Sequence, residues 1–254
     1  MNSIERSTIE KAGYAHGFEN VRESVPQRVT LYSARHRAEA WVEAVDGEAA
    51  DVWHLRFPET PPPSELLRSF PGIERIDDAY LVTGEAELGK LLRRAAELAK
   101  SLPDQAARNY EAEVQKIDAD KIERTEVLAL VKQRRGQALF REALLDYWGG
   151  ACAVTGIETA ELLRASHAKP WADCVSDSER LNVFNGFLLC AHLDALFDRG
   201  LMTFSKDGQA VFAARLQPEV RAQLNLQETM RFRWLSPEHA QFLDWHRSEV
   251  FLGS

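Results

Sequence analysis

The chain has 254 residues, of which 45% are hydrophobic, and its 31 Lys and Arg residues are outnumbered by 39 Asp and Glu residues, so that the formal net charge is -8. This length suffices for one large or two modest hydrophobic cores. The acidity excludes a generally basic protein that coats DNA, and no apolar run approaches the roughly 18 residues of a membrane-spanning helix.

The first half of the chain carries the signals of a small α+β domain. Residues 1–25 are polar and predicted to be weakly ordered. Residues 51–57 alternate between apolar and polar side chains, as a half-buried strand does, and residues 79–83 form a second predicted strand. An amphipathic helix is expected over 85–102. We therefore predict a small α+β domain at 26–103.

The second half begins with helical signals. Residues 104–124 are charged and are predicted to form a helical linker. A long helix is expected from residue 125 to 148, where Gly149 and Gly150 stop it. A cluster of cations on this helix is the best candidate for holding DNA phosphates, with a solvated helix face as the alternative. The cations assigned to DNA are Arg134, Arg135, Arg141 and Lys169.

Polar side chains then interrupt apolar runs in a way that indicates chemistry. A strand over 162–167 places His167 at its end, and Pro170 stops it because proline lacks a donor for the sheet. A turn at Asn185 and Gly186 precedes a second strand over 187–190. A short helix over 191–199 follows and is closed by Gly200.

Two carboxylates share one face of that short helix. Asp194 and Asp198 are four residues apart, and such carboxylates repel each other unless a cation joins them. A divalent metal held there, with a neutral imidazole opposite, could activate water and stabilise a phosphorane-like transition state. His192 is a competing ligand, although it does not share the face of Asp194.

The motifs in this region resemble those of the HNH endonuclease superfamily. The matching blocks occur in the same order between residues 134 and 202: Arg135-Gly-Gln137, Phe140-Arg141, Leu144-Leu145, Tyr147, Cys152-Ala-Val-Thr-Gly156, Ser166-His167, Pro170-Trp171, Asn185-Gly186 and Leu196-Phe-Asp198. The resemblance implies an α+β chain in which a ββα-metal nuclease module, over 125–254, follows the N-terminal domain.

The resemblance also implies roles for single residues. His167 would be the general base, and Asn185 would brace the adjacent loop or reach the metal. Asp194 and Asp198 would hold a divalent metal, Mg²⁺ or Mn²⁺. The position before the base, often a metal-binding Asp or His, is here Ser166, and a hydroxyl is a poor ligand beside a carboxylate.

The cysteines do not form the paired motifs of a zinc site. Cys152, Cys174 and Cys190 are single, and Thr155 stands where a second cysteine would follow Cys152. We therefore expect no structural zinc. This odd, small number of cysteines, without a secretory signal, favours a reducing cytoplasm.

The remaining signals complete the predicted module. Residues 201–204 and 210–212 flank the turn at 206–208 as a hairpin, and a terminal helix begins at Ser236 and Pro237. The leading hypothesis is a metal-dependent endonuclease of restriction or defence type that acts on double-stranded DNA, with the N-terminal domain at 26–103 choosing the target. A double-strand break needs two active sites or two visits, which favours a homodimer. One alternative, favoured by Ser166, is a DNA-binding module with a degenerate site. The other is a nuclease regulated by a ligand- or protein-sensing N-terminal domain.

Overall fold

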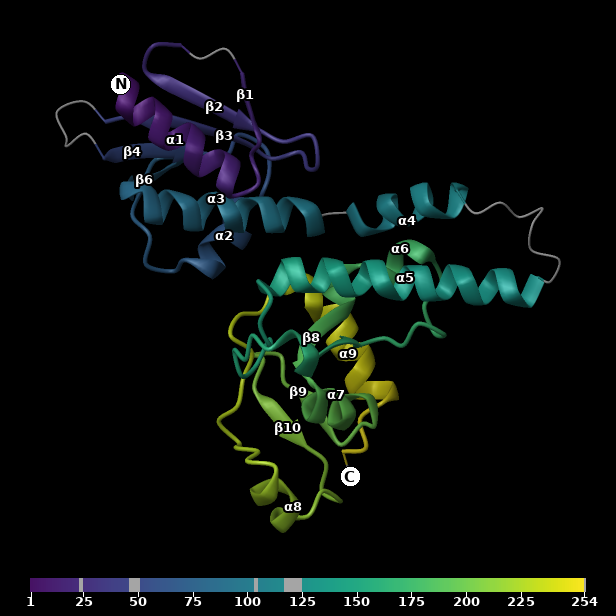
Figure 1. Cartoon of the computed structure of the whole chain (residues 1–254). Coiled ribbons are helices and arrows are strands. Elements are labelled where there is room, and N and C mark those ends of the chain that lie inside the picture. The colour runs from purple at the N-terminus through teal and green to yellow at the C-terminus, as the bar shows by residue number, and fades with distance from the viewer. Residues whose placement is uncertain (23–24, 46–50, 103–104, 117–124, 254) are drawn as a thin grey trace. The chain divides into compact units, whose positions relative to one another are not determined.

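The computed structural model describes residues 1–22, 25–45, 51–102, 105–116 and 125–253 (Figure 1). The chain divides into two compact units, Met1–Leu102 and Pro103–Ser254. Both units combine helices with strands, which confirms the predicted α+β class. Among the described residues, no helix has the length and apolar character needed to cross a bilayer.

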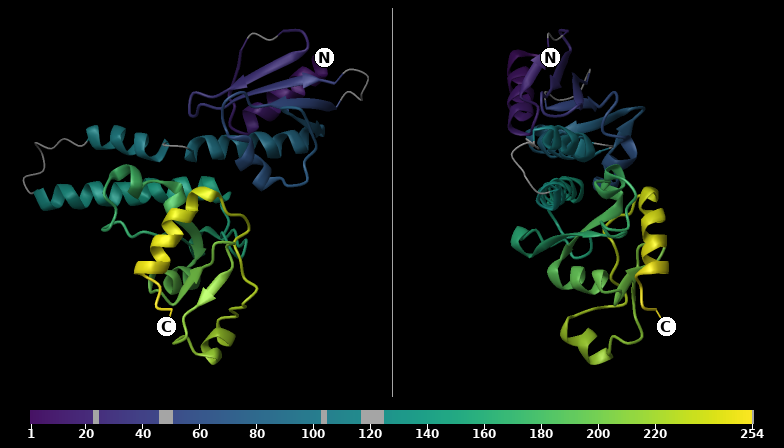
Figure 2. Two further views of the ribbon diagram at one scale, coloured as in Figure 1. Left: turned by 180° about the vertical axis from the view of Figure 1, so that it is seen from behind. Right: turned by 90° about the vertical axis from the view of Figure 1, so that its right-hand side faces the viewer.

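The first unit is built on an antiparallel sheet with the strand order β1-β2-β3-β4-β6-β5 (Figures 1 and 2). Its strands are β1 (Asn20–Arg22), β2 (Arg28–Tyr32), β3 (Glu39–Ala44), β4 (Val52–Arg56), β5 (Arg75–Ile76) and β6 (Ala79–Thr83). Its helices are α1 (Ser3–Ala15), α2 (Pro63–Ser69) and α3 (Gly84–Ser101). Helices α1 and α3 pack on each other, and they contact β2 and β6 respectively. The predicted strands at 51–57 and 79–83 and the predicted helix at 85–102 are confirmed as β4, β6 and α3.

The prediction of a weakly ordered start to the chain is wrong. Residues Ser3–Ala15 form α1, whose N-terminus is closed by a capping box between Asn2 and Glu5. The Asn2 side chain accepts hydrogen bonds from backbone N–H groups of the first turn, and the Glu5 carboxylate accepts one from the backbone of Asn2. Such caps satisfy donors that a helix leaves open, and burial of Ile9 and Ala12 supplies the packing that stabilises the helix.

The second unit starts with two helices, α4 (Gln105–Gln115) and α5 (Thr125–Trp148), that pack on each other. Helix α4 buries Ala106 and Tyr110. The helical part of the stretch predicted as a linker therefore belongs to the second unit, while residues 117–124 lie outside the described part of the chain.

The nuclease-like motif follows α5. Strands β7 (Leu163–His167) and β8 (Gly186–Cys190) pair in antiparallel fashion, and α7 (Ala191–Asp198) begins directly after β8. The register sets Ser166 opposite Phe187 and His167 opposite Gly186. The resulting order of hairpin and helix is the expected ββα arrangement.

The rest of the unit surrounds this motif with a hairpin and short helices. These elements are η2 (Ala160–Leu162), α6 (Asp177–Arg180), η3 (Val183–Asn185), β9 (Met202–Phe204), β10 (Ala210–Phe212), α8 (Pro218–Gln223), η4 (Pro237–His239) and α9 (Ala240–Glu249). An aromatic core joins them: the ring of Phe232 stacks on Phe187 at 4.3 Å and on Phe204 at 3.9 Å between centroids. This core holds the backbone of β8 and β9 in place beside the site.

Candidate active site

His167 ends β7 and is fixed from two directions. Its ring stacks on Phe140 of α5, with centroids 3.8 Å apart, and its Nε2 atom lies 2.8 Å from the backbone oxygen of Arg180. A carbonyl oxygen only accepts hydrogen bonds, so Nε2 carries the ring proton and Nδ1 keeps a free lone pair. Burial lowers the pKa of His167 to about 4, against the opposing effect of the Arg180 carbonyl. The imidazole is therefore neutral at pH 7 and able to accept a proton.

His167 lines a cavity of about 420 Å³. The indole of Trp171 borders it on the loop after β7, and Asp198 and Arg199 border it at the end of α7. His246 of α9 closes another part of the wall. An imidazole, a carboxylate and a guanidinium thus share one space, which is the combination needed to handle water and a phosphate group.

Asp194 and Asp198 lie on α7 and meet the hydroxyl of Ser166. Ser166 is buried in β7, and its Oγ donates a hydrogen bond to Asp198 Oδ1 at 3.2 Å. Burial raises the pKa of Asp194, and the Ser166 hydroxyl and Arg164 oppose this effect. Burial and then repulsion from Asp194 raise the pKa of Asp198. The ionised forms of both carboxylates are therefore disfavoured, and a bound cation would stabilise them.

This donor set fits a hard divalent cation that keeps several waters. Mg²⁺ is commonly held by one or two carboxylates together with water and substrate phosphate. Within the described ranges, no three His, Cys, Asp or Glu side chains gather into a metal-binding group. His192 is exposed on α7 and does not join Asp194 and Asp198. The structure thus brings together the two predicted carboxylates and leaves the competing ligand His192 apart from them.

Asn185 serves as an internal brace. Its side chain is fully buried, and its Oδ1 accepts the N–H of Lys169 at 2.8 Å. Its Nδ2 donates to the backbone oxygens of Lys169 and Glu179, at 3.1 and 3.2 Å, and to Cys174 Sγ at 3.3 Å. Through these contacts the Asn185 amide braces the loop after His167.

A second brace of that loop was absent from the sequence prediction. Arg180 donates from Nε to the Trp171 oxygen at 3.1 Å and from Nη2 to the Cys174 oxygen at 2.7 Å. Its Nη1 bonds Asp177 at 2.8 Å, and its guanidinium lies 5.7 Å from the centre of the Trp171 ring. The side-chain contacts of Arg180 therefore fix the residue whose backbone carbonyl orients His167.

Three of the four cations predicted to bind DNA take part in contacts within the protein. Arg141 donates to the backbone oxygens of Leu163 and Ala160, at 2.8 and 3.1 Å, and ties α5 to the start of β7. Arg135 pairs with Glu113 of α4 at 2.6 Å. The predicted role of Arg141 as a free phosphate ligand therefore needs correction, because two backbone oxygens hold its guanidinium. Arg135 keeps 54% of its side chain exposed beside this one ion pair, so its role at DNA stays a prediction.

The two other predicted cations differ from each other. Lys169 forms a 2.8 Å ion pair with Glu179, and only 15% of its side chain is exposed. Its predicted role at DNA is corrected in the same way. Arg134 is exposed on α5 and remains open to solvent.

Two glycines of the predicted motifs allow close packing around the site. A Cβ atom on Gly136 would lie 2.4 Å from Cη2 of Trp171, so α5 meets the cavity wall without a side chain between them. A Cβ atom on Gly186 would lie 2.4 Å from Cζ of Phe140, the ring that supports His167. The glycines at these positions are therefore required by contact rather than by backbone conformation.

Three side chains of the site were not assigned a catalytic or positioning role from the sequence: Arg180, Arg199 and Ser166. Arg199 directly follows Asp198, the expected metal ligand, and this position is the feature of the sequence that could have indicated its place in the site. The role of Arg180 depends on a loop of irregular backbone, which no periodic pattern predicts. Ser166 was noted as a departure, and the structure shows it as a hydrogen-bond donor to the carboxylate pair.

The cysteines are free and buried. The backbone N–H of Thr155 lies 3.4 Å from Cys152 Sγ, and the Thr155 hydroxyl lies 3.3 Å from Cys190 Sγ. Thr155 therefore joins the turn at Cys152 to the junction of β8 and α7.

Comparison with known proteins agrees with this geometry. A family model described as HNH endonuclease matches residues 152–205, the stretch that contains β7, β8, α7 and β9. No curated protein matches the chain. HNH nucleases act on DNA and generally use a divalent metal ion. Residues 152–205 of the second unit therefore match the HNH endonuclease family, which supports the resemblance to the HNH superfamily.

Proposed function

We propose that the chain is a divalent-metal-dependent endonuclease that hydrolyses phosphodiester bonds of double-stranded DNA. The observation that carries the proposal is the shared cavity of His167 and Asp198, in which the imidazole is neutral and its Nδ1 is free to accept a proton. The family match supports nuclease chemistry, and the carboxylate pair supplies a reason for metal dependence.

The chain's own residues divide the work of hydrolysis. Nδ1 of His167 takes a proton from the attacking water, and the imidazolium that forms keeps its Nε2–H bond to the Arg180 oxygen. Asp194 and Asp198 would hold the metal ion, which would act as a Lewis acid on the scissile phosphate. Ser166 orients Asp198 through its hydroxyl. The guanidinium of Arg199 offsets negative charge on the phosphate in the same cavity.

One observation favours a second candidate. Ser166 occupies the position at which HNH nucleases often have a metal-binding Asp or His. Among the described residues, Asp194 and Asp198 are the carboxylates of the site, and no third metal-binding side chain joins them. Such a site is also compatible with a DNA-binding module that has lost efficient catalysis. The two candidates differ in one property, the rate of bond cleavage in the presence of metal.

The test is incubation of the full-length protein with supercoiled plasmid and with phage DNA, in Mg²⁺, in Mn²⁺ and in EDTA. Metal-dependent nicking or linearisation, lost in His167→Ala, supports the enzyme. DNA binding without cleavage in either metal supports the binding module. Comparison of unmodified with base-modified phage DNA addresses the proposed restriction or defence role, and sedimentation analysis with and without DNA addresses the proposed homodimer.

A further inference from the structure

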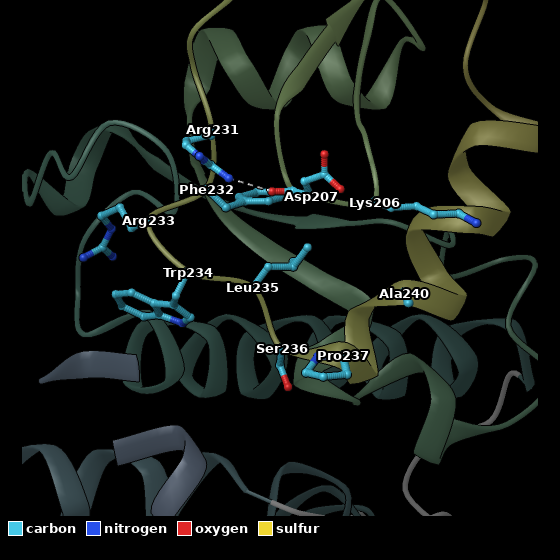
Figure 3. Close-up of a pocket in the computed structure, with 10 residues that line it drawn as sticks. All are labelled: Lys206, Asp207, Arg231, Phe232, Arg233, Trp234, Leu235, Ser236, Pro237 and Ala240. Carbon is cyan, nitrogen blue, oxygen red and sulfur yellow. Dashed lines mark hydrogen bonds between the residues drawn. The ribbon is translucent and has the colours of Figure 1, made fainter. Parts of the chain in front are cut away.

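A second cavity of the same unit, of about 630 Å³, lies among the β9–β10 turn, the segment 231–236 and the starts of η4 and α9 (Figure 3). Its charged lining residues are Lys206 and Asp207 of the turn and Arg231 and Arg233 of the following segment. Leu235 and Pro237 contribute apolar surface. None of these residues lines the His167 cavity, so this pocket is a separate feature.

The cations of this pocket are available to a ligand. Lys206 and Arg231 are exposed. Nη2 of Arg231 donates a hydrogen bond to the backbone oxygen of Asp207 at 3.2 Å (Figure 3). That bond fixes the guanidinium beside the turn, and its other N–H donors can meet an anion. This placement contrasts with Arg141 and Lys169, whose donors are directed to protein atoms.

The indole of Trp234, which lines the pocket, is in contact with two neighbouring side chains. The indole of Trp234 stacks on Trp148 at 4.8 Å, and the guanidinium of Arg233 lies 4.4 Å from the centre of the Trp234 ring. Arg233 is itself anchored to the backbone oxygens of Trp148 and Ala151 at 2.8 and 3.0 Å. A ligand therefore meets cations and aliphatic surface rather than an open ring. This favours contact with phosphate and sugar over the stacking of an unpaired base.

We propose that the pocket formed by Lys206, Arg231 and Leu235 binds the phosphodiester backbone of double-stranded DNA outside the cleavage site. The choice of DNA as the polyanion rests on the proposed function. In a chain with a net charge of -8, the grip on DNA must be local, and these two exposed cations line one pocket. Asp207 is the carboxylate that opposes this binding.

Four variants of the full-length protein test the proposal. Lys206→Ala combined with Arg231→Ala removes both cations, and Lys206→Glu reverses one exposed charge without touching a backbone contact. Asp207→Asn removes the opposing carboxylate. Arg215→Ala is the matched control, because Arg215 is also exposed in the second unit but does not line the pocket. Thermal melting establishes that each variant folds.

Binding is measured by fluorescence anisotropy with a labelled duplex in EDTA, over a series of salt concentrations. In a plot of the logarithm of affinity against the logarithm of salt concentration, each lost phosphate contact makes the slope less steep by about 0.9. The slope of the double variant should therefore be less steep by about two. Between about 50 and 200 mM salt, this corresponds to a roughly tenfold smaller drop in affinity. Lys206→Glu should weaken binding at low salt, Asp207→Asn should strengthen it, and Arg215→Ala should match the unmodified protein.

Hydrolysis of bis(p-nitrophenyl) phosphate separates this proposal from the proposed nuclease function, because so small a diester needs no distant grip. Unchanged hydrolysis in the double variant, with weakened duplex binding, supports the pocket as a DNA site. If the unmodified protein cleaves neither substrate but the double variant still loses duplex affinity, the nuclease proposal fails and the pocket stands. Three results would overturn the pocket proposal. The double variant could have the same duplex affinity and salt slope as the unmodified protein, or Arg215→Ala could lose as much duplex affinity as the double variant. The third result is that the unmodified protein binds no duplex.

Discussion

The Nε2 atom of His167 lies 2.8 Å from the backbone oxygen of Arg180, thirteen residues later in the chain. This bond selects the tautomer that leaves Nδ1 as the basic atom, and it stays in place when Nδ1 gains a proton. His167→Ala should therefore reduce DNA cleavage by about 10²–10⁴, the range of general acid–base catalysis, and leave duplex affinity nearly unchanged. Gel-based cleavage rates and anisotropy measure the two quantities separately.

Arg180 should act on the same step through position alone. In Arg180→Met the bonds to the Trp171 and Cys174 oxygens are lost, so the carbonyl that holds His167 is less well fixed. We expect a lower cleavage rate, with a smaller loss than in His167→Ala, and an altered pH–rate profile. Arg180→Lys should fail to restore the profile, because an ammonium group cannot reproduce the forked contacts. A pH–rate profile identical to that of the unmodified protein would exclude this positioning role.

Gly136 and Trp171 form a close contact that can be tested as a pair. Alanine is favoured over glycine inside a helix by about 1 kcal/mol, but overpacking costs about 1–3 kcal/mol. Because the new Cβ would lie 2.4 Å from the indole, Gly136→Ala should give a net loss of about 1 kcal/mol in the free energy of unfolding. Urea denaturation measures this change.

The control for this pair is Gly72→Ala, whose Cβ would meet no atom within 4 Å. It should change stability by only a few tenths of a kcal/mol. Trp171→Leu should relieve the overpacking, so that Gly136→Ala costs less in the Trp171→Leu background than in the unmodified protein. Additive effects of the two substitutions would contradict the contact.

Replacing either carboxylate of the Asp194–Asp198 pair should lower the affinity for metal and raise the stability of the metal-free protein. The raised pKa values of Asp194 and Asp198 mean that ionisation destabilises the folded protein. This cost is absent below the ordinary pKa of 3.8 and complete above the raised folded values. At pH 7, Asp194→Asn and Asp198→Asn should each weaken Mn²⁺ binding and each raise the melting temperature of the metal-free protein. Calorimetric titration and thermal melting in EDTA measure these effects.

The exposed Asp207 provides the comparison, since Asp207→Asn should leave Mn²⁺ affinity unchanged. If both α7 variants bind Mn²⁺ as tightly as the unmodified protein, the ligands must lie elsewhere. His192→Ala is then the next variant to measure, because His192 is on the same helix.

Local spacing predicted the parts of the site that depend on one or two neighbouring elements. His167 at a strand end, and Asp194 and Asp198 one helical turn apart, follow from periodicity within short segments. The ββα order followed from turn and cap signals in the same way. The motif glycines were visible as residues, whereas their contacts with Trp171 and Phe140 depend on how α5 packs.

The direction in which a polar side chain points was beyond the reach of these patterns. Arg141 faces the carbonyls of Leu163 and Ala160 because α5 packs against the start of β7, and no feature near Arg141 in sequence indicates those partners. Asn185 has partners 6, 11 and 16 residues away, gathered by an irregular loop. Helix α1 was missed for another reason: its capping box was present in the sequence, but the polar surface residues outweighed it.

Acid should destabilise the second unit through His246. Its Nε2 donates to the Phe197 oxygen at 3.1 Å, so Nδ1 accepts the Thr203 hydroxyl at 2.9 Å, and the ring is neutral. Burial lowers its pKa to about 4 from an ordinary 6.5. Between these values the unfolded chain binds more protons, so the free energy of unfolding should fall as the pH drops from 6.5 towards 4, by roughly 3 kcal/mol for this residue.

Urea denaturation at a series of pH values measures this loss. His246→Gln should be less stable than the unmodified protein at pH 7, and its stability should depend less on pH between 6.5 and 4. His167 and His36 also have lowered pKa values, so some dependence should remain in the variant. A variant with the full pH dependence of the unmodified protein would show that His246 is not the group responsible.

The boundary between the two units gives the last prediction. Helix α4 belongs to the second unit, where it buries Tyr110 and pairs Glu113 with Arg135. A chain beginning at Pro103 should therefore fold, while one beginning at Thr125 should be less stable by about 2–3 kcal/mol, because burial of one large side chain such as Tyr110 is worth about that much. Urea denaturation of both truncated chains measures the difference.

The same truncation tests what the first unit contributes. The site residues and the cations of both cavities all lie after Pro103, so the chain from Pro103 should retain metal-dependent hydrolysis of bis(p-nitrophenyl) phosphate. If the first unit selects the target, this chain should cut plasmid DNA with a changed or relaxed pattern at matched salt. An unchanged pattern and unchanged duplex affinity would mean that the first unit does not read DNA. A change in rate alone, with the same pattern, would instead favour regulation of the nuclease by a ligand or protein partner of the first unit.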